Sequence, residues 1–146
     1  MWYINVDGAS RGNPGKAGVG IVIKDSHVVC FKQGYSVGIM TNNQAEYWAL
    51  IIALSVFVNE FKNDEQLVIR SDSQLLVNQL NGSYSVKNPE LKILYQKVLH
   101  FLQKIPKYSV EHIYREQNTL ADEQANLGID QNISVPTQIR RYLTSL

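Results

Sequence analysis

The sequence contains little cysteine, almost no excess charge and no long apolar run. Its single cysteine, Cys30, excludes a disulfide framework within the chain and a cysteine-based zinc site, and it suits a reducing, cytoplasmic compartment. Fourteen Lys and Arg against 13 Asp and Glu leave a formal charge of +1, which excludes a strongly basic polyanion-binding domain. The apolar stretch between Glu46 and Glu60 is too short to cross a bilayer, and the first residues do not resemble a secretory signal. We therefore expect no membrane insertion, and any nucleic-acid binding must depend on a local patch.

A chain of 146 residues can form one domain with a sizeable core. Trp2, Ile4 and Val6 alternate with less apolar residues, and the turn-forming residues 12–15 follow them, which predicts a strand and a hairpin loop. The later patterns predict strands at 19–23, 28–31, 67–69 and 108–114 and helices over about 42–61, 73–80, 88–105 and 119–127, with Gly128 ending the last helix.

The order of these elements predicts an α/β fold with a five-stranded mixed sheet. The first three strands are joined by short loops, as in an antiparallel meander. A strand that follows a helical crossover adds in parallel, so we expect the fourth and fifth strands to run parallel to the first, with helices on both faces. We expect one domain over residues 1–128. Residues 129–146 form a tail that is too apolar for a disordered end, and we expect it to pack on that domain.

Four carboxylates fall at the edges of the expected elements. Asp7 is expected to end the first strand, Glu46 to lie in the first turn of the first long helix, Asp72 to follow the fourth strand and Asp122 to open the last helix. Neighbouring parallel strands would bring Asp7 and Asp72 side by side. Clustered carboxylates have raised pKa values and are costly unless a cation neutralises them, which points to hard divalent ions such as Mg²⁺. The alternative is that these are ordinary surface acids, because 13 acidic residues will place several near element ends by chance.

The residues around the four acids separate these alternatives. The acids lie in four motifs, which are Val6–Gly15 (VDGASRGNPG), Thr41–Glu46 (TNNQAE), Ser71–Gln74 (SDSQ) and Asn118–Asp122 (NTLAD). In their residues and their order, these motifs resemble those of type 1 ribonuclease H. The resemblance implies the ribonuclease H-like fold and an endonuclease that cuts the RNA strand of RNA/DNA hybrids, leaving 5′-phosphate and 3′-hydroxyl ends. It also implies two Mg²⁺ ions during catalysis, with Mn²⁺ as a substitute.

The same resemblance assigns roles to particular residues. Asp7 would bridge both ions, Glu46 and Asp72 would hold the ion near the leaving oxygen, and Asp122 would hold the ion that activates water. Glu46 would also accept a hydrogen bond from the ribose 2′-hydroxyl, which only RNA carries. The implied substrate-binding residues are Asn13, Asn43 and Gln74 in the minor groove and Thr41 at a phosphate of the DNA strand. The alternative interpretation is purely structural: Asn13 would be a turn residue, Thr41 a helix cap and Gln74 a residue on the helix surface.

The chain departs from the family pattern in two places. Many relatives carry a histidine on the loop before the last aspartate, whereas residues 114–122 contain none, and Arg115 or Glu116 is the candidate replacement. His112, on the preceding strand, is expected to be structural. The chain also lacks the basic helix and loop with which bacterial relatives grip the hybrid. Residues 87–107 offer partial compensation, with five lysines and one acid.

Two alternatives to a hybrid-specific endonuclease remain open. One is a broader ribonuclease that also cuts double-stranded RNA, because the basic helix and the loop histidine are both absent. The other is a non-catalytic hybrid-binding module. Four intact carboxylates argue against the second, since clustered negative charge does not help a protein to bind a polyanion. We expect the protein to act as a monomer.

Overall fold

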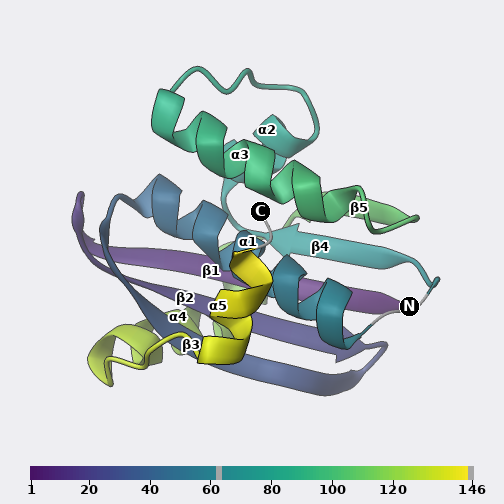
Figure 1. The fold of residues 1–146 in the computed structure, drawn as a ribbon, viewed down its shortest axis with the longest axis horizontal. Coiled ribbons are helices and arrows are strands. Elements are labelled where there is room, and N and C mark those ends of the chain that lie inside the picture. The colour runs from purple at the N-terminus through teal and green to yellow at the C-terminus, as the bar shows by residue number, and fades with distance from the viewer. Residues whose placement is uncertain (62–63, 145–146) are drawn as a thin grey trace.

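The structure is a computed structural model that describes residues 1–61 and 64–144 (Figure 1). Its strands are β1 (Trp2–Gly12), β2 (Gly15–Asp25), β3 (Val28–Met40), β4 (Leu67–Ser71) and β5 (Tyr108–His112). Its helices are α1 (Asn42–Glu60), α2 (Gln74–Leu80), α3 (Pro89–Leu102), α4 (Thr119–Asp130) and α5 (Thr137–Leu143), with the short 3₁₀ helix η1 (Arg115–Gln117) before α4.

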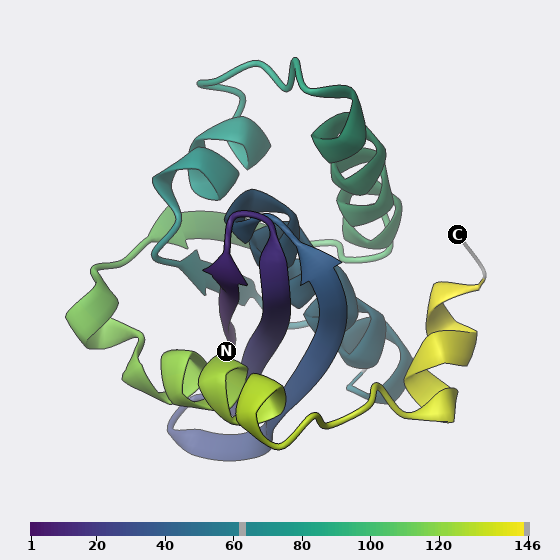
Figure 2. The ribbon, with the colours of Figure 1, turned by 90° about the vertical axis from the view of Figure 1, so that its left-hand side faces the viewer.

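The five strands form one mixed sheet with the order β3-β2-β1-β4-β5. β1, β2 and β3 pair antiparallel, whereas β4 pairs in parallel with both β1 and β5. The predicted fold class is therefore confirmed. Helix α1 packs on one face of the sheet and α4 on the other, so the central strand β1 is covered on both sides (Figures 1 and 2).

Helix α1 forms the centre of the core, which explains why its sequence is apolar almost all round. It lies between the sheet, α3 and α5, and its residues 49–57 are all buried. A helix buried on every side has no polar face, because no side of it meets water. Within the described residues, no helix combines the length and apolarity that crossing a membrane requires.

Several predicted boundaries were wrong. β3 extends to Met40, well beyond the predicted end at Phe31, because it is an edge strand whose mostly exposed side chains do not alternate in polarity. α4 continues through Gly128 to Asp130; a Cβ on Gly128 would lie 2.6 Å from the Tyr35 backbone nitrogen, so this glycine serves close packing on β3. α3 ends at Leu102, although Ile105 beyond it is buried.

The C-terminal segment contains α5, a helix that the sequence analysis did not predict. α5 packs on α1, where Ile139 is 4% exposed. The Ser36 amide donates a hydrogen bond to the Ile133 carbonyl, so the segment also covers part of the outer edge of β3. Residues 145–146, the end of the expected tail, lie outside the described residues.

Candidate active site

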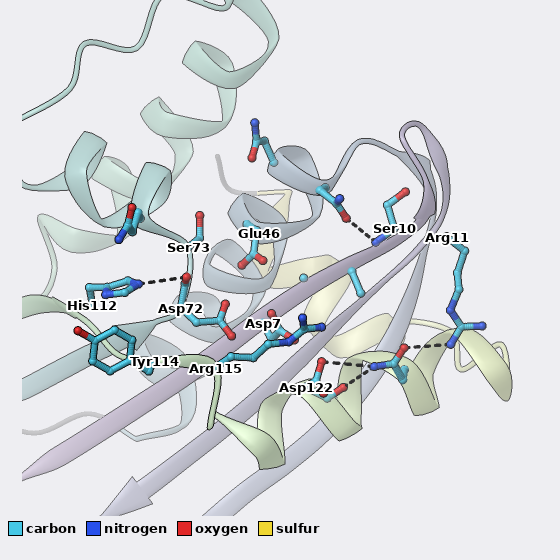
Figure 3. A pocket seen from close by; sticks show the side chains of 16 residues that line it. Asp7, Ser10, Arg11, Glu46, Asp72, Ser73, His112, Tyr114, Arg115 and Asp122 are labelled. Atoms are coloured by element: carbon cyan, nitrogen blue, oxygen red, sulfur yellow. Dashed lines mark hydrogen bonds between the residues drawn. The ribbon is translucent and has the colours of Figure 1, made fainter. Parts of the chain in front are cut away.

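The register between β1 and β4 places the first two acids. Asp7 was predicted to end β1, but the strand continues to Gly12 because it pairs with β2 as far as the hairpin. The parallel pairing of β1 with β4, however, ends at Val6 and Ser71. Asp7 directly follows Val6, and Asp72 directly follows Ser71, so the two acids lie side by side where the strands separate (Figure 3).

Glu46 reaches Asp7 because Gly8 lets α1 approach β1 without an intervening side chain. A Cβ on Gly8 would lie 2.3 Å from the Ala45 carbonyl carbon and 2.4 Å from the Glu46 nitrogen. Thr41 caps α1, which makes Glu46 the fifth helical residue, one turn deeper than the predicted first turn. At that depth Glu46 faces β1 at the level of Asp7.

Asp122 approaches from the opposite face of the sheet through a second glycine contact. Gly20 pairs with Asp7 across the β1–β2 ladder. A Cβ on Gly20 would lie 1.8 Å from the carbonyl oxygen of Ala121, the residue before Asp122. The start of α4 therefore lies directly on the sheet beside Asp7.

All four predicted carboxylates line one open cavity of about 780 Å³ (Figure 3). One oxygen from each of Asp7, Glu46 and Asp72 lies within 4.8 Å of the other two. Asp122 lines the same cavity and lies close enough to contribute to the raised pKa of Asp7. Four elements far apart in the sequence thus bring their acids to one site.

Burial and mutual repulsion raise the pKa values of these carboxyls. Burial, followed by the charge of Asp72, raises the pKa of Asp7 from 3.8 to about 8. Burial, followed by the charges of Asp7 and Asp72, raises the pKa of Glu46 well above 4.5. The pKa of Asp72 is also raised, chiefly by burial, while the Arg115 charge opposes the shift. The cluster therefore carries an electrostatic cost that a bound cation would relieve.

The donor set fits a divalent metal ion. Within the described residues, the buried Oε2 of Glu46 has no hydrogen-bond partner, although buried polar atoms normally have one. This oxygen belongs to a cluster of carboxylates, the ligands that hard cations such as Mg²⁺ and Mn²⁺ bind. An ion at the cluster would both satisfy Glu46 and neutralise its neighbours.

The other predicted site residues are divided between the cavity and its support. Asn43 and Gln74 line the cavity. Thr41 and Asn13 are not among its lining residues. Thr41 accepts a hydrogen bond from the Gln44 amide as the α1 cap, and Asn13 accepts one from the Asn42 amide at 3.1 Å. Thr41 therefore stabilises the first turn of α1, and Asn13 holds that turn against the hairpin.

The cavity also contains residues that the sequence analysis did not assign to it. His112 lines it, and its Nε2 lies 3.2 Å from the Asp72 carbonyl oxygen, so this histidine is at the site as well as on β5. Arg11 and Asn126 also line it. Their positions could have been inferred from spacing, because Arg11 is four residues after Asp7 on a strand and Asn126 is four after Asp122 on a helix.

This sheet, with carboxylates from β1, α1, the end of β4 and α4 around one cavity, has the architecture of the ribonuclease H-like fold. A family model described as reverse transcriptase-like matches residues 5–128. The solved structure of LC11-RNase H1 in complex with RNA/DNA hybrid superposes with a TM-score of 0.84 at 39% identity, over 90% of this chain and 98% of that one.

Two sequence relatives agree with the structural match. Ribonuclease HI of Halobacterium salinarum is 38% identical over 85% of this chain, and a bifunctional protein of Mycobacterium tuberculosis is 36% identical over 87%. The chain spans 62% and 35% of the lengths of these two relatives. The chain belongs to the type 1 ribonuclease H family.

Proposed function

We propose that this protein is an endonuclease that hydrolyses the RNA strand of RNA/DNA hybrids, giving 5′-phosphate and 3′-hydroxyl ends. The observation that carries the proposal is the open cavity lined by Asp7, Glu46, Asp72 and Asp122. The LC11-RNase H1 complex, a relative with a bound hybrid, supports the choice of substrate. All four acids come from one chain, so we propose that a monomer is active. The exposed thiol of Cys30 suits a reducing cytoplasm.

The four carboxylates would hold Mg²⁺, with Mn²⁺ as a substitute. Divalent ions at such a site supply the charge that activates a water and stabilises the leaving oxygen of a phosphodiester. The protein's part is to hold the carboxylates before the substrate arrives. Glu46 would in addition accept a hydrogen bond from a ribose 2′-hydroxyl.

Asn43 and Gln74 are proposed to contact sugars and base edges in the minor groove, because their side chains line the cavity and each amide can both donate and accept. Thr41 is proposed to contact a phosphate of the DNA strand near the start of α1, where the exposed turn of a helix attracts phosphate. Asn13, which lies beside that turn, is proposed to contact the minor groove. The exposed lysines of residues 87–107, of which Lys92 lies on α3, are proposed to add salt-dependent contacts to the sugar-phosphate backbone.

The function is tested with a labelled RNA strand presented as an RNA/DNA hybrid, as double-stranded RNA and as single-stranded RNA, each with Mg²⁺, Mn²⁺ or chelator. Hybrid cleavage that requires metal is the expected result. Equal cleavage of double-stranded RNA would support the broader ribonuclease instead. Binding of hybrid without cleavage in either metal would support the binding module and refute the proposal.

Arg115 is proposed to assist at the position where relatives have a histidine. It lines the cavity and its charge lowers the pKa of Asp72, so it can also offset charge on the scissile phosphate. Arg115→Ala is expected to lower kcat about tenfold or more at saturating Mg²⁺. Glu116→Gln is the matched control, because Glu116 does not line the cavity. An unchanged kcat in Arg115→Ala would remove Arg115 from the site.

We propose that residues 129–146 stabilise the catalytic domain over 1–128, chiefly through Ile139. Ile139→Ala is expected to cost about 2–4 kcal/mol of unfolding free energy, because the side chain is buried against the core. Arg141→Ala, an exposed change on the same helix, should cost much less. Chemical denaturation measures both. A stability of Ile139→Ala equal to that of the unchanged protein would mean that this contact does not stabilise the fold.

A further inference from the structure

A second group of polar side chains extends from the carboxylate cluster along the surface between β1 and α4. Asp122, Asn126 and Asp130 are spaced four residues apart on α4, so they share one face of the helix. Arg11 shares a face of β1 with Asp7 because they are separated by an even number of residues. The two faces meet at the edge of the cavity, where Arg11 and Asn126 both line it (Figure 3).

Hydrogen bonds link Asp130, Arg11, Asn126 and Asp122 into one network. Arg11 Nη1 donates to Asp130 Oδ1 at 2.7 Å, and Arg11 Nη2 donates to Asn126 Oδ1 at 3.0 Å. Asn126 Nδ2 donates to the Asp122 backbone carbonyl at 3.0 Å and reaches the Asp122 carboxylate oxygen Oδ1 at 3.4 Å (Figure 3). Both ends of the Asn126 amide are therefore engaged, one by Arg11 and the other by Asp122.

The chemistry of the partners fixes which way the amide points. A guanidinium can only donate hydrogen bonds, so the Asn126 group that faces Arg11 must be its oxygen. The NH₂ group then faces Asp122, where Nδ2 lies within hydrogen-bond distance of both the carbonyl oxygen and the carboxylate Oδ1. The reverse orientation would bring Oδ1 against the Asp122 carboxylate and leave two acceptors facing each other. Arg11 in turn is held in place by its ion pair with Asp130.

We propose that Arg11 and Asn126 are positioning residues for the metal-binding carboxylate Asp122. Asn126 orients the Asp122 carboxylate, and Arg11 acts through Asn126 by fixing the orientation of its amide. Outer groups that hydrogen-bond to a metal ligand hold that ligand in its binding orientation, and their loss typically weakens metal affinity or activity by about 10–100-fold. The expected loss of kcat rests on the proposed function, whereas the expected loss of metal affinity does not.

The experiment compares Arg11→Ala, Asn126→Ala and the double variant with the unchanged protein. Asn126→Ala is expected to lower kcat on RNA/DNA hybrid at least tenfold with KM within about twofold, and to weaken Mn²⁺ binding, measured by calorimetry without substrate, by a similar factor. Arg11→Ala should lower both quantities by a smaller factor, because the amide remains but its orientation is no longer fixed. The double variant should be no worse than Asn126→Ala, since Arg11 acts through Asn126.

Glu123→Ala is the matched control, because Glu123 is exposed on α4 and does not line the cavity. It should retain the kcat and Mn²⁺ affinity of the unchanged protein. Arg11→Lys tests the geometry of the guanidinium: a lysine keeps the charge but cannot present two fixed donors to Asp130 and Asn126 together, so it should resemble Arg11→Ala.

Three outcomes would overturn the proposal. A raised KM in Arg11→Ala, with effects that multiply in the double variant, would mean that Arg11 binds substrate phosphate directly. A lowered melting temperature with unchanged kcat and Mn²⁺ affinity would mean that the network only stabilises the fold. Unchanged Mn²⁺ affinity in Asn126→Ala would refute the proposal even if the unchanged protein cleaved no hybrid. Absence of cleavage with the predicted loss of Mn²⁺ binding would instead count against the proposed function alone.

Discussion

Replacement of Asp7 by asparagine is expected to reduce hybrid cleavage at saturating Mg²⁺ by at least about 10²–10³-fold, the range for loss of one transition-state-stabilising group. Asparagine has nearly the same shape, but it removes the negative charge at the centre of the cluster, where Glu46 and Asp72 each have an oxygen within 4.8 Å of an Asp7 oxygen. Mn²⁺ binding, measured by calorimetry, should weaken in parallel. Retained cleavage in Asp7→Asn would mean that the cluster is not the site of chemistry.

The same substitution should make the metal-free protein more stable. The Asp7 pKa is about 8 in the folded protein and 3.8 ordinarily, so folding favours the protonated form. This contribution is fully present below pH 3.8 and is lost as pH rises through 8, so the metal-free protein should lose stability across that interval. At pH 9 in chelator, Asp7→Asn should gain about 1–3 kcal/mol of unfolding free energy, because asparagine buries no charge.

Thermal melting from pH 5 to pH 9 in chelator measures this effect. The unchanged protein should show a falling melting temperature that Mg²⁺ restores at high pH, whereas Asp7→Asn should show a flatter profile and a weaker response to Mg²⁺. Identical pH profiles for the two proteins would mean that folding does not raise the pKa of Asp7.

Gly8→Ala is expected to damage both the fold and the site. The new Cβ would lie 2.3–2.4 Å from backbone atoms of Ala45 and Glu46, and no flexible side chain is available to move away. Relief requires α1 to shift from β1, at a cost of about 1–3 kcal/mol or more. Such a shift separates Glu46 from Asp7, and a displacement of about 1 Å at a catalytic group can lower kcat about 10²-fold. Denaturation and steady-state kinetics measure the two effects.

Gly82→Ala provides the control for adding a methyl group. Gly82 has a φ of +81°, and a Cβ added there would have no heavy atom within 4 Å, so only backbone strain is added, at about 1–2 kcal/mol. This variant should lose some stability but keep its kcat. If Gly8→Ala also kept its kcat, the contact between β1 and α1 would not set the distance between Asp7 and Glu46.

The elements could be predicted from the sequence where the signal is local. Alternation along residues 2–6 marked β1, and the Thr41 cap marked the start of α1. β3 beyond Phe31 could not be predicted, because its pairing with β2 stabilises a strand whose own pattern is weak. α5 was missed for a similar reason, since its apolar residues become a helical face only against α1.

The sequence by itself determined the class of fold, the four motifs and the identity of the carboxylates, because strand alternation, helix capping and motif order are properties of short segments. Only the tertiary structure decided how those acids meet. The end of the β1–β4 pairing at Val6 and Ser71 sets Asp7 beside Asp72, and Gly8 and Gly20 allow α1 and α4 to approach from opposite faces. The link from Arg11 through Asn126 to Asp122 arises in the same way. Such contacts depend on register and close packing between distant segments, which no local pattern specifies.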